Sequence, residues 1–314
     1  MNSKTKILIT GSIARDTIMG FPGLFSTVLK KNNLDHLNVS FGVDTLVEHL
    51  GGTGLNIAYN TRLLTDAPIY MFGGVGRDHE DIIEFLKQKN INTEGIVVDK
   101  ELYTATGKVV TDKDQNQIWS FYPGAIIRGK EIDLTPHAKD SILVLSANEE
   151  GAFLETQRQA IELGVPYLYD PGMALSWIKD IDLTEGIKHA KWLIGNESEI
   201  PQIEERTKGI SKNMIERGGA LITTFGKDGV EYKDTKNTYR VPVYEIEAKD
   251  PTGAGDSWRG GFLAGLLKGK SIEESLALGN AIASFAVASS GTVNHNPTKR
   301  EVKERARSIV ECAK

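Results

Sequence analysis

The stretch from Lys249 to Lys270, KDPTGAGDSWRGGFLAGLLKGK, decides the fold of this chain. It opens on a turn of small residues, Thr252-Gly253-Ala254-Gly255, continues through the carboxylate of Asp256, and ends in an apolar run from Trp258 to Leu267. The helical spacing of the large apolar residues in that run predicts a helix with one stripe packed inward. The helix is therefore predicted to begin where the glycines end.

The start of a helix is a natural seat for a phosphate group. Its first backbone N–H groups have no partner within the helix, and the helix dipole adds partial positive charge. Gly253, Ala254 and Gly255 would supply that backbone without side-chain bulk. Asp256 taken alone is more often a helix cap than a catalytic group. Beside an anion seat, however, it indicates phosphoryl transfer to a hydroxyl whose proton the carboxylate accepts.

These residues resemble a known family. DPTGAGDSWRGGF is similar to the C-terminal signature of the ribokinase-like kinases, the PfkB carbohydrate kinase family, which includes ribokinase, fructokinases and adenosine kinases. The resemblance implies that Asp256 is the catalytic base and that the backbone of Gly253, Ala254, Gly255 and Asp256 forms the anion hole. It further implies an α/β fold, a three-layer αβα sandwich with a central, mostly parallel sheet and a small β-sheet lid. We expect one kinase domain over residues 1–314, with the lid inserted from about 15–48 and 103–124.

Composition excludes several other classes. The chain has 314 residues, with 37 Lys and Arg against 42 Asp and Glu, and a net charge of −5 without a long run of either sign, which argues against a nucleic-acid binder. No run approaches the roughly 20 apolar residues that cross a bilayer. Cys312 is the single cysteine, and the N-terminus does not read as a signal peptide. We therefore expect a cytoplasmic protein with no membrane partner.

Apolar runs of strand length recur along the chain. The first is Lys6–Thr10, and the others cover residues 69–72, 141–146, 166–170, 192–195 and 221–225. Helical patterns lie between them. This alternation is typical of a parallel sheet covered by helices.

The expected substrate residues follow the first strand and the first glycine cluster. Asp16 lies just beyond the carboxyl end of the first strand, where open α/β sheets bind ligands, although an ordinary turn residue would look the same. A GG-x-G cluster is by itself a weak signal. The resemblance implies more, because the family's GG-x-x-x-N segment maps onto Gly51, Gly52 and Asn56 and binds ribose hydroxyls. It also implies that Asp16 accepts hydrogen bonds from sugar hydroxyls.

A hairpin carries the signal for the acceptor class. Two β-rich runs, 104–111 and 117–121, flank a polar turn at 112–116. The segment from Gln117 to Ala125 resembles the Q-x-x-x-F-x-P-G-A stretch of prokaryotic nucleoside kinases, with Gln117 and Phe121 as substrate contacts. Since a purine needs an aromatic or apolar surface to stack on, this favours a nucleoside over a free sugar. The other interpretation of these aromatic residues is a lid core.

Three further segments are expected around the nucleotide. Asn196 and Glu199 fit the family's N-x-x-E motif, which places Glu199 near Mg²⁺ through water, whereas the residues alone would read as a helix cap. Thr224, Gly226 and Gly229 resemble its T-x-G-x-x-G nucleotide segment, and a plain hairpin would fit them as well. The resemblance implies that Asn280 lies near the adenine of ATP. It also points to Asp250 and residues 288–291 as a place where some members bind K⁺.

Two stretches fit less well. Residues 21–48 show no regular pattern, and we place no element there beyond the part of the lid that the resemblance implies. Residues 73–78 resemble the family's G-x-V-G-x-D segment, but Asp81 departs from it, since many members carry glycine at that position. The turn is therefore expected to differ in detail.

The leading hypothesis is an ATP-dependent kinase that phosphorylates the 5′-hydroxymethyl group of a ribonucleoside, with adenosine as the first expected substrate. A sugar kinase of the ribokinase or fructokinase type is the runner-up, and a catalytically silent nucleotide or sugar sensor is the alternative from another class. A nicotinamide-dependent dehydrogenase lacks its G-x-G-x-x-G fingerprint. Exposed lid edges leave a homodimer open.

Overall fold

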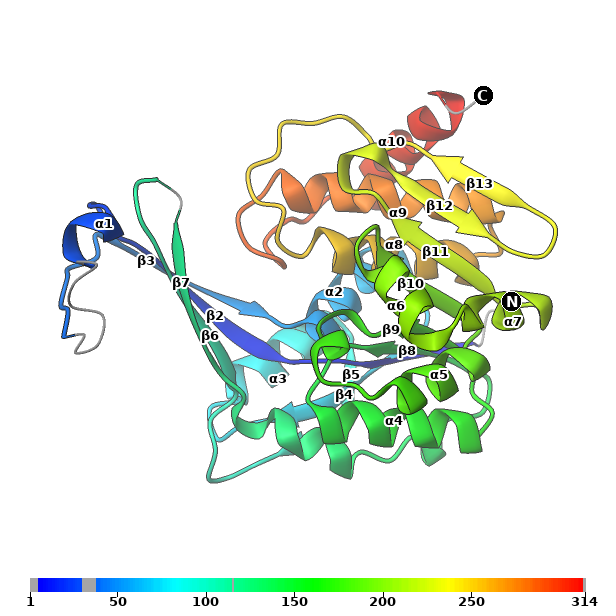
Figure 1. Cartoon of the computed structure of the whole chain (residues 1–314), viewed down its shortest axis with the longest axis horizontal. Helices are drawn as coiled ribbons and strands as arrows, with labels where there is room; N and C mark the ends of the chain where they lie inside the picture. The colour runs from blue at the N-terminus through cyan, green and yellow to red at the C-terminus, as the bar shows by residue number, and fades with distance from the viewer. Residues whose placement is uncertain (1–4, 30–37, 115, 313–314) are drawn as a thin grey trace.

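The computed structural model describes residues 5–29, 38–114 and 116–312 (Figure 1). The strands are β1 (Lys6–Thr10), β2 (Ala14–Gly20), β3 (Thr45–Gly51), β4 (Ile69–Val75), β5 (Asn92–Val98), β6 (Ala105–Thr111), β7 (Gln117–Tyr122), β8 (Ser141–Ser146), β9 (Tyr167–Asp170), β10 (Trp192–Asn196), β11 (Ala220–Thr224), β12 (Val230–Lys233) and β13 (Thr238–Val241). The α-helices are α1 (Phe25–Val28), α2 (Thr53–Leu64), α3 (Glu80–Gln88), α4 (Glu150–Glu162), α5 (Asp180–His189), α6 (Glu199–Thr207), α7 (Ile210–Glu216), α8 (Ala254–Leu267), α9 (Ile272–Val287) and α10 (Lys299–Cys312). Single 3₁₀ segments at 124–131, 135–137, 172–176 and 226–228 connect them.

The main sheet has the order β13-β12-β11-β10-β9-β8-β1-β4-β5. The strands from β11 to β5 are parallel, and β12 and β13 are added antiparallel at one edge. The six sequence runs predicted as strands all lie in this sheet.

Helices cover both faces of the main sheet because successive strand residues point to opposite sides. On β1, Ile7 and Ile9 belong to the core with α2, α3, α8, α9 and α10, whereas Leu8 belongs to the core with α4, α5, α6 and α7. Strand β8 alternates in the same way. Both faces are thus apolar, as buried parallel strands require.

A second sheet projects from one end of the molecule, with the order β3-β2-β6-β7 (Figure 1). Strand β2 pairs antiparallel with β3 and parallel with β6, and β6 forms the predicted hairpin with β7. Side chains on β3 and β7 are largely exposed. This small sheet therefore presents open faces instead of a packed core.

The predicted fold class, an αβα sandwich of mostly parallel strands with a small second sheet, is confirmed. The small sheet uses residues on both sides of β4, α3 and β5 in the sequence. Residues 30–37 of the expected first lid segment, and residue 115 in the hairpin turn, lie outside the described residues. No helix in the described part of the chain combines the length and apolar character needed to span a bilayer.

Candidate active site

The parallel strands deliver polar residues to one edge of the main sheet. Strands β9, β10 and β11 end on Asp170, Asn196 and Thr224, and β1 leads into the loop before Asp16. Helices α2 and α8 pack against each other on one face of the sheet. This edge is where an open α/β sheet places its ligand site.

The first turn of α8 has the form of an anion seat. Gly253 is the N-cap with a φ of 75°, a left-handed conformation that suits glycine. The Ala254 N–H donates to Pro251 O at 3.2 Å. The N–H groups of Gly255 and Asp256 find no acceptor among the described residues, and Gly255 is exposed. Two free donors at a helix N-terminus can bind phosphate oxygens.

Asp256 stands beside those donors and is held by Asn56. Asn56 Nδ2, in the first turn of α2, donates to Asp256 Oδ2 at 2.8 Å. Burial raises the pKa of Asp256 to about 6, although the positive charge of Arg259 and the hydrogen bond from Asn56 lower it. A carboxylate with this pKa is largely ionised at neutral pH and can still accept a proton, as a general base must.

Asn56 has an unused acceptor. The residue is buried, and its Oδ1 finds no hydrogen-bond partner within the described part of the chain. Buried polar atoms are rarely left unpaired in proteins. A ligand hydroxyl beside Asp256 would satisfy it.

Asp16 occupies a slot in the small sheet. Its carboxylate lies between two glycines, because a Cβ at Gly51 would be 2.2 Å from Oδ2 and one at Gly107 would be 2.7 Å from Oδ1. Gly52 caps α2 with a φ of 92°. Thr292 lies between this slot and the anion seat of α8. Its side chain is 3.8 Å from a Cβ built on Gly51 and 2.7 Å from one built on Gly253. Asp16 and the first turn of α8 therefore lie on either side of Thr292.

Phe121 stands in the same row of the small sheet as Asp16. Asp16 pairs with His49 on β3 and Gly107 on β6, and Gly107 pairs with Phe121 on β7. Directly paired residues share a face, and so do alternate residues of one strand, so Gln117 and Trp119 lie on this face as well. Gln117 is tied to Trp119 by a hydrogen bond of 3.0 Å. Phe121 is 61% exposed.

The predicted nucleotide residues lie on the strands beside this edge. Asn196 Oδ1 accepts from the N–H of Glu199 at 2.9 Å, and Glu199 Oε2 accepts from the N–H of Asn196 at 2.8 Å, so the pair also forms a helix cap. Asn196 and Thr224 are paired across β10 and β11. Gly226 and Gly229 both have positive φ in the turn between β11 and the antiparallel β12, so the segment is a hairpin.

The side-chain amide of Asn280 forms hydrogen bonds within the protein. Its Nδ2 donates to the carbonyl oxygens of Val241 and Pro242 at 3.1 and 2.7 Å, and its Oδ1 accepts from Trp258 Nε1 at 2.8 Å. The residue is buried. Its hydrogen-bonding groups therefore tie α9 to α8 and the end of β13, and its place near the adenine of ATP stays a prediction.

Sequence reasoning missed an ion pair beneath the α8 turn. Arg259 Nη2 donates to Asp170 Oδ1 at 2.6 Å, and Arg259 Nε lies 2.6 Å from Oδ2. Both residues are buried. In the sequence, Asp170 is only the last residue of the strand-length run 166–170, although a carboxylate at a strand end is a signal for the ligand edge of an open α/β sheet.

The departure at Asp81 has a partner. Arg15, next to Asp16 on β2, donates from Nη1 to Asp81 Oδ2 at 2.8 Å and from Nε to Asp78 Oδ2 at 3.2 Å. Asp78 Oδ1 in turn accepts from the N–H of Thr104 at 2.8 Å. These contacts fix the places where the chain enters β2 and β6. Asp81 therefore helps anchor the small sheet.

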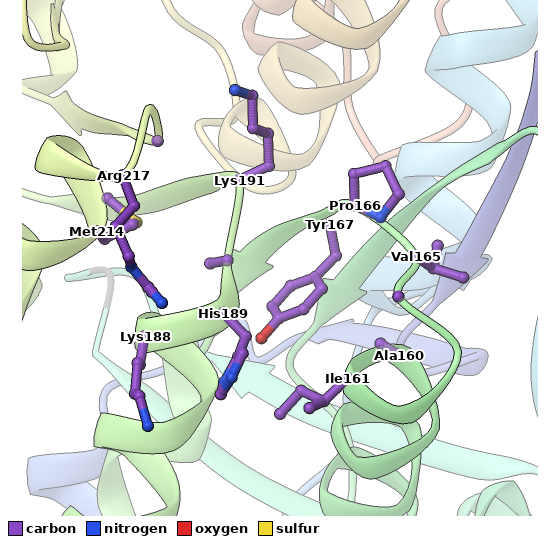
Figure 2. Close-up of a pocket in the computed structure, with 13 residues that line it drawn as sticks. Ala160, Ile161, Val165, Pro166, Tyr167, Lys188, His189, Lys191, Met214 and Arg217 are labelled. Carbon is purple, nitrogen blue, oxygen red and sulfur yellow. The ribbon is translucent and has the colours of Figure 1, made fainter.

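A hollow of about 320 Å³ lies away from these residues, where β9 and β11 begin and α4, α5 and α7 end (Figure 2). The cationic side chains that line it, among them Lys188 and Lys191, do not point toward a common ligand position. Figure 2 shows Lys188 and Lys191 pointing in opposite directions, away from Tyr167, and Lys191 Nζ donates to Gly218 O at 2.5 Å. Cations at helix C-termini complement the helix dipole. The hollow therefore gives no ground for a second anion site.

The described side chains do not form a metal site by themselves. Within the described residues, no group of three or more His, Cys, Asp or Glu side chains is placed to hold a metal ion. Glu199 offers one carboxylate, of which Oε2 is used by the cap. Such a residue can hold only an ion that brings most of its ligands as water and phosphate, as Mg²⁺ does.

Comparison with known proteins places this geometry in context. A family model described as pfkB family carbohydrate kinase matches residues 26–299. The chain is 27% identical to a nucleoside kinase of Methanocaldococcus jannaschii over 94% of this chain and 97% of the relative, and 29% identical to a ribokinase of Bacillus subtilis over 81% and 86%. A nucleoside kinase of Burkholderia thailandensis, solved in complex with inosine, superposes with a TM-score of 0.83 at 29% identity over 96% of this chain and 97% of that one.

Proposed function

Because this chain belongs to the pfkB family of carbohydrate kinases, and is thus a phosphotransferase with an alcohol group as acceptor, we propose that it phosphorylates the 5′-hydroxymethyl group of a ribonucleoside. We take ATP as the donor, since a nucleoside kinase of Burkholderia thailandensis has been solved in complex with ADP-inosine. In this proposal Asp256 is the general base. The resemblance inferred from the sequence is confirmed at the level of the family.

One observation carries the choice of a nucleoside. Asp16, Gly107 and Phe121 stand in one row on one face of the small sheet, so a carboxylate and an aromatic ring flank a position without a side chain. A sugar ring with hydroxyls on Asp16 would leave its base over Phe121. Stacking on an aromatic ring is how proteins commonly hold a base. A free sugar held on Asp16 would leave that ring uncovered.

The names of similar proteins support the same choice. The relatives from Methanocaldococcus jannaschii and Burkholderia thailandensis are called nucleoside kinases, and the second binds inosine in its solved complex. The ribokinase of Bacillus subtilis has a similar identity, so identity alone does not decide between nucleoside and free sugar. The aromatic row of the small sheet is what favours the nucleoside.

The reaction then follows from groups already described. The substrate hydroxyl would lie between Asp256 and Asn56, whose Oδ1 is free to accept a hydrogen bond from the substrate. Asp256 would orient the hydroxyl and take its proton as the new O–P bond forms and the bond from the γ-phosphorus to the bridging oxygen of ADP breaks, so that ADP leaves. This proton transfer contributes roughly 10²–10⁴ in rate. The amides of Gly255 and Asp256 would bind the oxygens of the transferring phosphoryl group. Alignment and charge stabilisation of this kind supply most of the catalysis in phosphoryl transfer.

The donor would approach along the ends of β10 and β11. Asn196, Thr224, Gly226 and Gly229 lie there and stay our predicted nucleotide residues. Glu199 would hold Mg²⁺ through water, and the ion would neutralise charge on the ATP phosphates. Asp250 and residues 288–291 stay the predicted place for K⁺, and Asp250 already accepts from the N–H groups of Thr252 and Gly291.

A homodimer stays part of the proposal. Strands β3 and β7 are the edges of the small sheet, and unpaired edges can pair with another chain. Light scattering on the purified protein would measure its mass. A monomer at all concentrations would remove the dimer without affecting the proposed reaction.

A substrate panel tests the function. Adenosine, inosine, guanosine and cytidine are offered beside free ribose and fructose, each with Mg-ATP, and ADP release is followed. We expect nucleosides to react and to yield 5′-monophosphates. Turnover of free sugars with nucleosides inert would establish the sugar kinase instead. No ADP release with any acceptor, although nucleoside binds, would support a silent sensor.

A further inference from the structure

A buried ion pair lies directly under the proposed catalytic turn. Arg259 is 8% exposed and Asp170 is 3% exposed. Beyond the two contacts to Arg259, Asp170 Oδ2 accepts from Ser146 Oγ at 2.9 Å. A buried ion pair adds little net stability, because the charges lose their hydration. A helix rich in small apolar residues could carry an uncharged residue at position 259, so stability alone does not explain this pair.

The guanidinium lies against the first turn of α8. Long side chains on a helix fold back toward its N-terminus, and Arg259 stands four residues after Gly255. A Cβ at position 255 would lie 2.8 Å from Arg259 Nη1. Arg259 Nη1 therefore lies beside the turn that presents Asp256.

Only a few charged or polar groups affect the protonation of Asp256. Arg259 acts from the same helix and Asp170 from β9, while Asn56 on α2 donates a hydrogen bond. Glu199, at the start of α6, acts on Arg259. The pKa of Asp256 is raised mainly by burial and further by Asp170, and it is lowered by Arg259 and Asn56. Arg259 and Asp170 therefore act on the carboxylate in opposite senses.

We propose that Arg259 and Asp170 form a positioning pair that sets the proton affinity of Asp256, with Arg259 holding the base ionised and Asp170 limiting how strongly Arg259 does so. The inference rests on the proposed role of Asp256 as the base. Asp170 also holds the guanidinium by the hydrogen bond from Nη2 and by the close approach of Nε, so that the charge keeps one position relative to the turn. Without Asp170 the arginine could swing to Asp256 and lower its basicity.

The pH dependence of kcat/KM for the nucleoside, at saturating Mg-ATP, tests the pair. Arg259→Gln should move the acidic limb to higher pH by at least about half a unit, and Asp170→Asn should move it to lower pH. The double variant R259Q/D170N, with a neutral amide pair in place of the ion pair, should fall between the wild type and R259Q. Titration of ATP itself is common to all variants and cancels in the comparison.

A purely structural role predicts a different result. Loss of packing would lower the rate at every pH and leave the limb in place. Limbs that do not move, or that move in the same sense in R259Q and D170N, would overturn the proposal. Arg259→Lys should keep the limb near its wild-type position because the charge is retained, whereas a limb displaced as far as in R259Q would count against it.

A second measurement covers variants that fold poorly, since removing one partner of a buried pair leaves the other charge buried and unpaired. The double variant leaves no unpaired charge. In protein with ¹³C-labelled aspartate side chains, the Asp256 signal, assigned by its loss in Asp256→Asn, should titrate at higher pH in the double variant than in the wild type. An unchanged midpoint would refute the inference. If Asp256→Asn keeps turnover, the base assignment itself fails, whereas inactive Asp256→Asn with unmoved midpoints removes only the role of the pair.

Discussion

Asn56 Nδ2 donates a hydrogen bond of 2.8 Å to Asp256 Oδ2 and so joins the first turn of α2 to the first turn of α8. The two residues are 200 positions apart in the sequence. The bond fixes one carboxylate oxygen of Asp256 and leaves Asn56 Oδ1 free. One amide can thus orient both the base and the hydroxyl that the base is proposed to deprotonate.

Asp256→Asn should greatly reduce turnover while nucleoside binding persists. The amide keeps the shape of the side chain but cannot take the proton, so kcat should fall by roughly 10²–10⁴. Steady-state ADP release measures the rate, and calorimetric titration with nucleoside measures binding. Turnover close to that of the wild type would disprove the role of Asp256.

The same variant should be at least as stable as the wild type at pH 7.5. The pKa of Asp256 is raised from 3.8 to about 6, so the folded protein binds this proton more tightly than the unfolded chain does. The ionised carboxylate therefore costs the folded state increasingly as pH rises between those two values. Asparagine removes that cost. Thermal unfolding at pH 7.5 should give a Tm equal to or above that of the wild type, and a lower Tm would indicate that the carboxylate makes a stabilising contact.

Activity should fall as pH decreases through about 6, the pKa of Asp256. Only the ionised base can accept the proton, so kcat/KM for the nucleoside should show an acidic limb near this value. Asn56→Ala removes a hydrogen bond that favours the ionised form, so its limb should lie at higher pH and its KM for the nucleoside should rise. A limb that stays in place in Asn56→Ala would show that the bond does not affect the base.

The main sheet and the α8 turn could be predicted from the sequence because their signals are local. An apolar run such as residues 141–146 has the length of one buried strand, and glycines followed by an apolar helix indicate an anion seat. By contrast, β3 could not be found, because its first side chains are exposed and show no alternation between buried and exposed. The row that aligns Asp16 with Phe121 depends on strand register, which the sequence does not display.

The position of Asp170 at a strand end could be read from the sequence, but its pairing with Arg259 could not. Arg259 occurs within an apolar helical run, and its partner Asp170 is 89 residues away. Asn280 is a similar case. The resemblance predicts a place near adenine, whereas its hydrogen bonds to Trp258, Val241 and Pro242 form only after α8, α9 and β13 have packed. Side-chain partners across the fold are set by tertiary packing.

Asp81→Asn should weaken nucleoside binding without slowing the chemical step. Asp81 pairs with Arg15, the neighbour of Asp16, so its loss should loosen the point where the chain enters β2. We expect KM for the nucleoside to rise several-fold, with kcat and KM for ATP unchanged. Because the pair is partly exposed, the stability loss should stay under about 1 kcal/mol.

Asp66→Asn is the matched control for that experiment. Asp66 forms an exposed ion pair with Lys299 on α10, away from the small sheet. Asp66→Asn should change neither kcat nor KM for the nucleoside. Equal increases of KM in Asp81→Asn and Asp66→Asn would show that the effect is general and that Asp81 has no special link to Asp16.

Phe121→Ala should separate nucleoside from sugar chemistry. If the base of the substrate stacks on Phe121, the variant loses about 1–3 kcal/mol of binding, so KM for nucleosides should rise by about 5- to 150-fold. Tyr122→Ala is the control, since Tyr122 is the next residue of β7, is exposed, and points to the opposite face of the small sheet. It should leave KM unchanged. If the protein phosphorylates free ribose at all, Phe121→Ala should leave the KM for ribose unchanged, because ribose has no base to stack. If Phe121→Ala and Tyr122→Ala raise KM alike, the row from Asp16 to Phe121 is not the nucleoside site, and the case for a nucleoside over a sugar loses its structural support.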